Sequence, residues 1–368
     1  MNRRKFLRNS GAALSGTALY MTGRNVNPVS GKQLTPDAIP NDFAFAPDMR
    51  RLNDETTGFA TSEWGSDVIA YARTPKIEES SRKYQPHGLV FQCTFMVANV
   101  MDSEGTKYNL LRSFDASSSI ITHATRSIPD GVTLAQPIFK PGEMYMSRCE
   151  NEQIESKAIQ VKPYLANPGL MNILLEPQKA QWQDVSGRVN FEYKALGPAL
   201  EFYCPGLLED NMYRSEPQWV KGTIDGIEVQ GFGVIDSAWG PAGTDWSQSK
   251  IFRYLEEYWV VWCNVYEDDS KECGVYMSGV DNFGCGYYNP DGQALVRGRS
   301  DTQILWTPDG FIQGANFSVG DTAFEFTMNA RVVKAPGYLS WASGAVRRVD
   351  EKRTPKMSFA WFEFLPKR

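Results

Sequence analysis

The sequence has little histidine and no long hydrophobic run. Only two of its 368 residues are histidines, His87 and His123, which excludes a metal site built on several imidazoles. No run of about 18 apolar residues occurs, so we expect no membrane-spanning segment. Basic residues number 38 and acidic residues 43, giving a formal net charge of -5. Because nucleic-acid binders need a basic face, we expect no nucleic-acid partner.

The signatures of several common chemistries are also missing. There is no Gly-x-Ser-x-Gly elbow, no phosphate-binding loop and no His-Glu-x-x-His motif. We therefore expect no metal and no cofactor. The six cysteines form no Cys-x-x-Cys pair, and we expect most of them to be buried free thiols; they are Cys93, Cys149, Cys204, Cys263, Cys273 and Cys285.

The N-terminus has the pattern of an export signal. Residues 3–8 read Arg-Arg-Lys-Phe-Leu-Arg, and a short, weakly apolar run of small residues follows. This order is typical of a twin-arginine signal peptide, the alternative being a disordered basic tail. We interpret residues 1–30 as the signal and 31–55 as an extended lead-in. The expected partner is the twin-arginine export machinery, and the expected location is periplasmic or secreted.

The rest of the chain has the pattern of strands. Residues 87–101 are rich in β-branched and aromatic side chains, and a polar turn follows them. Asp225-Gly226 stands between Ile224 and Ile227 and predicts a two-residue hairpin. Turn signals recur along the chain, and their spacing predicts an all-β fold with few short helices.

The chain length predicts two domains. Residues 204–218 are turn-rich and polar and lie between two β regions. We therefore place a boundary there and expect an N-terminal domain over 56–210 and a C-terminal domain over 215–368. Each is expected to be a β-barrel or sandwich.

Aromatic residues and glycines crowd into residues 219–266. Five of the ten tryptophans lie in this segment. Glycine lets a backbone approach a ligand closely, so the pattern is typical of a lined cavity. A packed aromatic core at the end of a barrel would give the same pattern, and both interpretations stay open.

Residues 219–246 resemble a motif of the two-domain lipocalin-like superfamily. That group includes AttH-like proteins, bacterial carotenoid 1,2-hydratase and fungal Diels–Alderases. The motif is a Gly-x-Val-x-Val-Asp-Gly hairpin, then Gly-x-Gly, Asp-His-x-Trp-Gly and Asp-Trp. The matching elements here are Gly222 to Gly226, Gly231-Phe-Gly233, Asp236-Ser-Ala-Trp-Gly240 and Asp245-Trp246. The resemblance implies two lipocalin-like barrel domains packed side by side and an apolar ligand of isoprenoid or polyketide type.

For the carotenoid hydratases, the resemblance implies that a carboxylic acid protonates an isoprenoid double bond and water captures the carbocation. Such an acid needs a raised pKa, and the cation needs aromatic faces. Asp236 and Trp239 match motif residues, while Tyr266 and Asp268 resemble a downstream Tyr-x-Asp acid site; these four are the catalytic candidates. The ligand-binding candidates are Ser237, Asp245, Trp246, Glu257, Trp259 and Trp262.

Each candidate also has a purely structural interpretation. Asp236 would accept backbone hydrogen bonds, Trp239 would fill a core, and Tyr266 with Asp268 would form a polar hairpin turn. Ser237 replaces the histidine of the motif and removes a titratable group. We therefore keep three hypotheses: a cofactor-free hydratase, isomerase or cyclase; a non-catalytic carrier of an apolar ligand; and a structural envelope protein. An enzyme predicts a buried acid with a raised pKa beside aromatic residues.

Overall fold

The computed structural model describes the chain from Ile69 to Leu365 with several gaps. The described residues are 69–115, 118–140, 146–163, 171–204, 210–244, 246, 257–279, 284–290, 292, 294–298, 302–334 and 339–365. They form strands β1 to β22 and the short 3-10 turns η3 (Ile77–Ser80), η4 (Pro86–Gly88) and η5 (Val185–Gly187). The expected all-β class is confirmed. The predicted signal over 1–30, the lead-in over 31–55 and Asp245 lie outside the described residues.

The first sheet contains thirteen antiparallel strands in the order β1-β11-β12-β10-β9-β8-β7-β6-β4-β3-β2-β13, with β5 beside β4. Because β12 also pairs with β13, this order returns on itself, and the strands close into a barrel with β1 and β11 as an extension. The strands are β1 (Ile69–Arg73), β2 (Val90–Met101), β3 (Lys107–Asp115), β4 (Ser118–Ser127), β5 (Gln136–Pro137), β6 (Met146–Ile154), β7 (Ala158–Pro163), β8 (Met171–Glu176), β9 (Lys179–Asp184), β10 (Val189–Ala195), β11 (Ala199–Cys204), β12 (Asn211–Ile224) and β13 (Ile227–Gly240).

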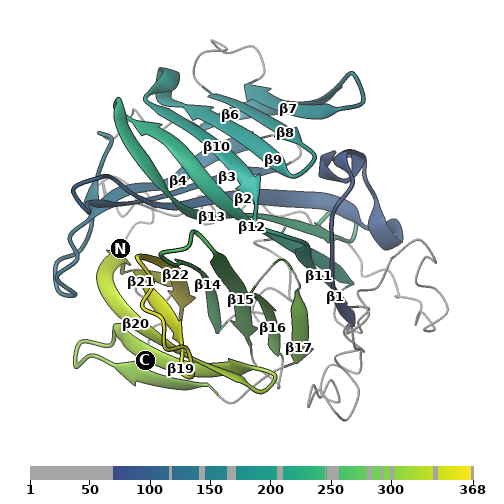
Figure 1. Ribbon diagram of the computed structural model, residues 1–368. Coiled ribbons are helices and arrows are strands. Elements are labelled where there is room, and N and C mark those ends of the chain that lie inside the picture. Colours follow the sequence, from purple (N-terminus) through teal and green to yellow (C-terminus); the bar gives the residue numbers. More distant parts are fainter. Residues whose placement is uncertain are drawn as a thin grey trace, which may run out of the picture.

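The second sheet contains nine strands in the order β17-β16-β15-β14-β22-β21-β20-β19-β18. It curls beside the first sheet and lies below it in Figure 1. Two curled antiparallel sheets are what the lipocalin-like resemblance implies. The strands are β14 (Tyr258–Val265), β15 (Lys271–Ser278), β16 (Gly284–Asn289), β17 (Leu295–Gly298), β18 (Gln303–Trp306), β19 (Ile312–Val319), β20 (Thr322–Val333), β21 (Ser340–Arg348) and β22 (Met357–Phe364).

The pairing of β12 with β13 in a long hairpin closes the first barrel. Its turn is the predicted Asp225-Gly226, and both residues have positive φ, 51° and 80°. Ile224 pairs directly with Ile227 across this turn, which confirms the two-residue hairpin. Beyond the turn β13 also pairs with β2 along its length.

Close backbone approach explains the two glycines of the Gly-x-Gly motif. A Cβ on Gly231 would lie 2.4 Å from the carbonyl oxygen of Asn99, and one on Gly233 would lie 2.2 Å from that of Val97. Any larger side chain there would collide with β2. These motif glycines therefore hold β13 against β2.

The core has three apolar layers. One fills the first barrel and includes Trp182 and Trp239. A second, the inter-sheet layer, contains residues of both sheets, such as Phe232 and Trp361. The third lies inside the second sheet and includes Trp262. The inter-sheet layer joins the two sheets through an apolar contact.

The division between the sheets differs from the predicted domain boundary. The prediction divided the chain at 204–218, whereas the hydrogen-bonded sheets divide between Gly240 and Tyr258. Strands β12 and β13, which the prediction assigned to the second domain, belong to the first sheet. The turn signals at 204–218 only separate β11 from β12, which are antiparallel neighbours.

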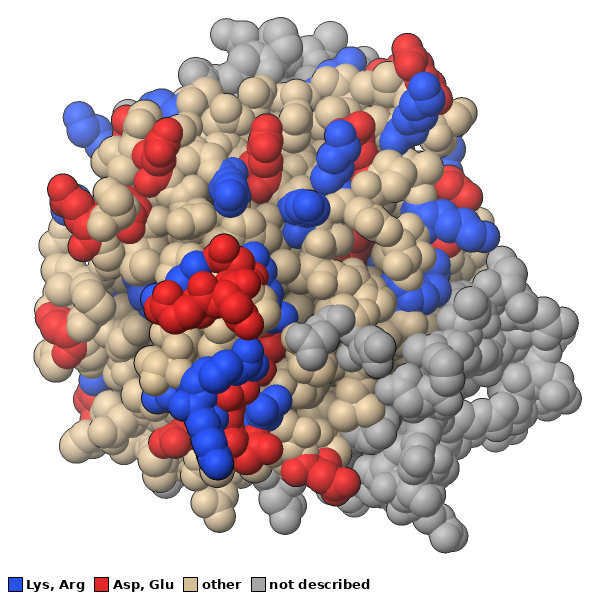
Figure 2. Space-filling model, in the orientation of Figure 1, with Lys and Arg blue, Asp and Glu red and all other residues tan. Residues whose placement is uncertain are grey.

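All six cysteines are buried and none forms a disulfide, as expected. On the face in Figure 2, acidic and basic side chains are interspersed. In the described part of the chain, no helix has the length and apolar character needed to cross a membrane. The same part contains no group of three or more His, Cys, Asp or Glu side chains placed to hold a metal ion.

Candidate functional site between the two sheets

The alternation of β13 sends the motif residues to opposite faces of the first sheet. Asp236 and Ala238 face the inter-sheet layer, where Ala238 is part of the apolar cluster. Trp239 faces the interior of the barrel. Ser237 also points away from Asp236, and its hydroxyl lies 2.8 Å from that of Thr94. The motif therefore does not form one continuous site.

Asp236 is a carboxylic acid buried between the sheets. It pairs with Ser215 on β12 and Phe95 on β2, and it is only 3% exposed. Burial raises the pKa of Asp236 to about 8. Hydrogen bonding by Ser215 and Tyr213 opposes this shift, while the negative charges of Glu363 and Glu216 add to it. The side chain is therefore a neutral acid at pH 7.

The second sheet supplies a carboxylate that faces Asp236. Glu363 of β22 pairs with Trp259 on β14 and with Trp341 on β21, so these three side chains share one face. Glu363 accepts a hydrogen bond of 2.9 Å from the indole nitrogen of Trp361. The neutral acid of one sheet therefore lies near an indole-bound carboxylate of the other.

Aromatic side chains surround this pair of acids. Trp246 stacks on Tyr213 with ring centroids 5.8 Å apart, and Trp341 lies 5.4 Å from Trp361. All four, together with Trp259, belong to the inter-sheet cluster. Such rings exclude water and present π faces that stabilise positive charge.

Several polar atoms of this layer lack a partner. Oδ1 of Asp236 and the indole nitrogens of Trp259 and Trp341 are buried, and none has a hydrogen-bond partner in the described parts of the chain. A buried polar group without a partner costs roughly 1–3 kcal/mol. One unpartnered oxygen of the Asp236 acid and two unpartnered indole donors are therefore available to a polar group of a ligand.

The ring of Trp239 was predicted to stabilise a carbocation of the substrate. In the structure it faces a cationic side chain of the protein itself. The guanidinium of Arg214 lies 5.0 Å from the Trp239 ring centroid, inside the barrel. Trp239 is 1% exposed and also packs edge-on against Phe91 at 6.3 Å. Its structural interpretation, a plug of the core, fits this environment.

Arg214 is part of a buried ring of four charges. It bonds Glu201 at 2.6 Å and Glu79 at 2.7 Å, and Arg73 bonds the same two carboxylates at 2.8 Å and 2.6 Å. Only the topology brings these residues together, because they come from η3, β1, β11 and β12. No motif in the sequence indicates them.

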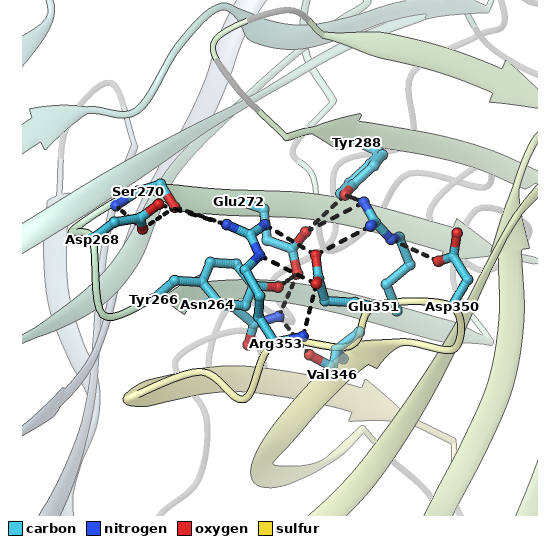
Figure 3. Close-up of polar contacts among 11 residues, drawn as sticks. Asn264, Tyr266, Asp268, Ser270, Glu272, Tyr288, Val346, Asp350, Glu351 and Arg353 are labelled. Atoms are coloured by element: carbon cyan, nitrogen blue, oxygen red, sulfur yellow. Dashed lines mark hydrogen bonds and ion pairs between the residues drawn. The ribbon is translucent and has the colours of Figure 1, made fainter.

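Tyr266 and Asp268 lie at the β14–β15 turn (Figure 3), at the opposite end of β14 from Trp259. The Tyr266 hydroxyl donates a 2.5 Å hydrogen bond to Glu272, and the hydroxyl of Tyr288 donates another at 2.7 Å. Asn264 donates a third at 2.9 Å. Burial and the Glu272 contact raise the pKa of Tyr266. Glu272 is thus surrounded by donors and forms a closed polar network within the second sheet.

The predicted role of Asp268 as a proton donor requires a buried, apolar environment, but Asp268 lies in an exposed, polar one. Its side chain is 65% exposed. It accepts bonds from the hydroxyl and backbone of Ser270, and these lower its pKa. A lowered pKa keeps the carboxyl group ionised at pH 7, so Asp268 is not a proton donor there. Asp268 is part of a polar hairpin turn.

The remaining ligand-binding candidates divide between the layers. Trp246 and Trp259 lie in the inter-sheet layer with Asp236. Trp262 lies inside the second sheet, 5.0 Å from Phe324. Glu257 is half-buried, and its backbone nitrogen bonds the carbonyl of Ser278. The structure therefore unites three of the predicted residues, namely Asp236, Trp246 and Trp259.

Sequence reasoning missed Glu363, Trp341 and Trp361. The alternation Trp361-Phe-Glu363 does indicate a shared strand face, but nothing local shows which sheet that face meets. Tyr213 was missed for the same reason. These residues become recognisable only through the packing of one sheet on the other.

Comparisons with known proteins return structures alone, since no protein family and no curated protein matches the chain. A protein assigned as AttH from Nitrosomonas europaea is similar, with a TM-score of 0.44, 10% identity, and coverage of 76% of this chain and 93% of that one. Kievitone hydratase from Nectria haematococca is similar with a TM-score of 0.35, 9% identity, and coverage of 87% and 98%. Both likenesses concern the fold alone.

Proposed function

We propose that the protein acts on an apolar isoprenoid- or polyketide-type small molecule bound between the two sheets, with Asp236 as the proton donor. The observation that supports this most is a buried, neutral carboxylic acid beside aromatic rings. The reaction class is cofactor-free hydration or dehydration, isomerisation or cyclisation of a carbon–carbon double bond.

The proposed step needs only an acid and water. The π electrons of the double bond take the proton of Asp236, forming a C–H bond and a carbocation and leaving the carboxylate. Water then bonds to the cation, and its surplus proton returns to Asp236, so the net change is addition of one water. Loss of a neighbouring proton from the cation gives isomerisation instead. The faces of Trp246 and Trp259 would stabilise the positive charge.

The unpartnered atoms of the layer favour a ligand with one polar end. The indole N–H groups of Trp259 and Trp341 would donate to a hydroxyl or carbonyl oxygen. The rest of the ligand would lie against aromatic rings. Glu363, which is half-buried, would orient the attacking water.

A carrier without catalysis is the second candidate, and Ser237 favours it. The hydroxyl bonds Thr94 on the face opposite Asp236, so no imidazole assists the acid from the motif position. A carrier would bind the same class of ligand and leave it unchanged.

The test incubates the protein with a panel of isoprenoid alkenes and polyenes in D2O. Mass spectrometry then reports the addition of water or the incorporation of deuterium at carbon. We expect Asp236→Asn to lower turnover by about 100-fold or more, as for loss of a general acid, while affinity stays within about tenfold. Asp321→Asn is the matched control, because Asp321 is exposed in a turn.

Each outcome decides between the candidates. Undiminished turnover by the Asp236→Asn variant would contradict the proposal that Asp236 is the proton donor. Binding without turnover by the unchanged protein assigns it as a carrier. Absence of both binding and turnover, with no small molecule extracted from the purified protein, would favour a structural role.

We also propose that the protein is exported by the twin-arginine route. The support is the order Arg3-Arg4, then Phe6-Leu7, then a short run of small residues. Replacing both arginines with lysine should retain the protein in the cytoplasm, as cell fractionation would show. Export of this double variant at the normal level would contradict the proposal.

A further inference from the structure

A second candidate site lies on the opposite face of β12 from Asp236. Strand β12 pairs with β11 along residues 211–215 and with β10 along residues 218–224. Between these stretches the chain crosses from β10 to β11, and the sheet leaves a gap. A surface pocket opens at this gap, beside the segment of residues 74–80.

The pocket is small, and polar and apolar atoms line it about equally. Most of its space is open to solvent or lies between atoms, and the enclosed part has room for only about one or two water-sized groups. Backbone hydrogen bonds hold its walls, from Ala195 to Gln178 at 2.8 Å and from Leu196 to Pro217 at 3.0 Å. The walls are thus preformed, and the space suits a small headgroup.

Two polar side chains of β12 belong to the lining of this pocket. Glu216 and Gln218 both line it, and their spacing of two places them on one face of the strand. Gln218 is 1% exposed, and its Oε1 is buried without a hydrogen-bond partner in the described residues. Its unused acceptor and the neighbouring carboxylate favour a ligand that donates hydrogen bonds.

The ion-pair network behind the pocket contains more carboxyl groups than guanidinium groups. Arg214 is shared among Glu79 and Glu201 of the buried ring and Glu216, whose Oε1 lies 3.9 Å away. Together with Arg73, the network holds two guanidiniums and three carboxyl groups, a net charge of -1 when Glu216 is ionised. Glu216 is the member of this network that lines the pocket, and its side chain is 20% exposed.

Two other charged groups line the pocket. Lys76 is exposed at its rim, so solvent screens that charge. Glu176 is already paired with Lys179 at 2.9 Å. Neither cancels the charge at the floor of the pocket.

We propose that this pocket binds a small primary ammonium group, held by the Glu216 carboxylate and by Oε1 of Gln218. An ammonium supplies three N–H donors and one positive charge, which match an unpartnered acceptor and an unbalanced carboxylate. A quaternary ammonium has the charge without the donors, and an alcohol has a donor without the charge. The site is therefore expected to reject both.

Titration of the full-length protein with methylammonium and ethanolamine, followed by NMR chemical-shift changes, tests the proposal. Tetramethylammonium and ethanol serve as matched probes. We expect both amines to bind at least tenfold more tightly than either matched probe. Glu216→Gln and Gln218→Leu should each weaken amine binding at least fivefold. The control Glu228→Gln, at an exposed position on β13, should change it less than twofold.

A pH series separates this role from a structural one. Burial raises the pKa of Glu216 to about 7, opposed by Arg214, with Glu201, Glu79 and Arg73 as the other charges that face it. Amine affinity should therefore increase between pH 6 and pH 8 in the unchanged protein but not in Glu216→Gln. Equal binding by tetramethylammonium, a flat pH series, or unchanged affinity in Glu216→Gln would overturn the proposal.

Discussion

At the residue scale, Asp236 shows what a sequence motif does and does not predict about a site. The sequence predicted an acid at this position, and the structure buries it among Trp246 and Trp259, which were also predicted. The same reasoning made Asp268 a candidate acid with a polar hairpin turn as its alternative, and the structure exposes it at that turn. Residue types and their spacing identify candidate residues within one short segment. Whether each candidate is buried depends on contacts between strands that are distant in sequence.

Replacing Asp236 by Asn should alter the pH dependence of stability. The folded-state pKa of about 8 lies above the ordinary 3.8, so the folded state holds a proton that the unfolded state releases between these values. The free energy of unfolding should therefore fall as pH rises from about 4 to 8, by up to about 1.4 kcal/mol per unit. Urea unfolding of both proteins across this range measures the effect. Parallel curves would show that Asp236 is ionised in the folded state.

At the element scale, strand β12 carries two sites on its two faces. Ser215 lies beside Asp236, and the next residue, Glu216, faces the pocket. The charge of Glu216 is one cause of the raised pKa of Asp236. The hairpin of β12 and β13 was predicted from Asp225-Gly226, because a two-residue turn is a local signal. The assignment of that hairpin to the first sheet was not predictable, since pairing with β2 and β10 joins residues far apart in sequence.

Gly233→Ala should destabilise the protein more than most single substitutions. The new Cβ would lie 2.2 Å from the carbonyl of Val97 and 2.8 Å from the side chain of Val220. Relief requires that β13 move away from β2, and we expect a loss of about 1–3 kcal/mol. Thermal unfolding measures this, with Gly226→Ala as a comparison, because that turn glycine has no atom within 4 Å and tests positive φ alone. An unchanged midpoint in Gly233→Ala would contradict the close approach.

At the scale of the whole molecule, the inter-sheet layer joins the sheets and contains the candidate site. Chain length and turn spacing predicted two β units, and the lipocalin-like resemblance implied that they are in contact. The sequence did not predict which strand faces meet, because alternation marks two faces without identifying their partners. His123 belongs to this layer, since its ring lies 5.2 Å from that of Trp341 and 6.2 Å from that of Trp361.

Acid should weaken the contact between the sheets through His123. Burial lowers the pKa of His123 to about 3 from the ordinary 6.5, so unfolding takes up a proton between these values. The free energy of unfolding should thus decrease as pH falls from about 6.5 to 3, and His123→Gln should reduce this slope. Equilibrium unfolding between pH 4 and 7 compares the two proteins. The same slope in both would show that His123 is protonated between the sheets.

The most direct test of the account is the ionisation state of Asp236. Infrared difference spectroscopy of the unchanged protein against Asp236→Asn isolates the carbonyl stretch of a single protonated carboxylic acid. We predict that this band is present at pH 7 and disappears with a midpoint of about 8. A difference spectrum at pH 7 with only the bands of an ionised carboxylate would contradict the central claim that a neutral acid lies between the sheets.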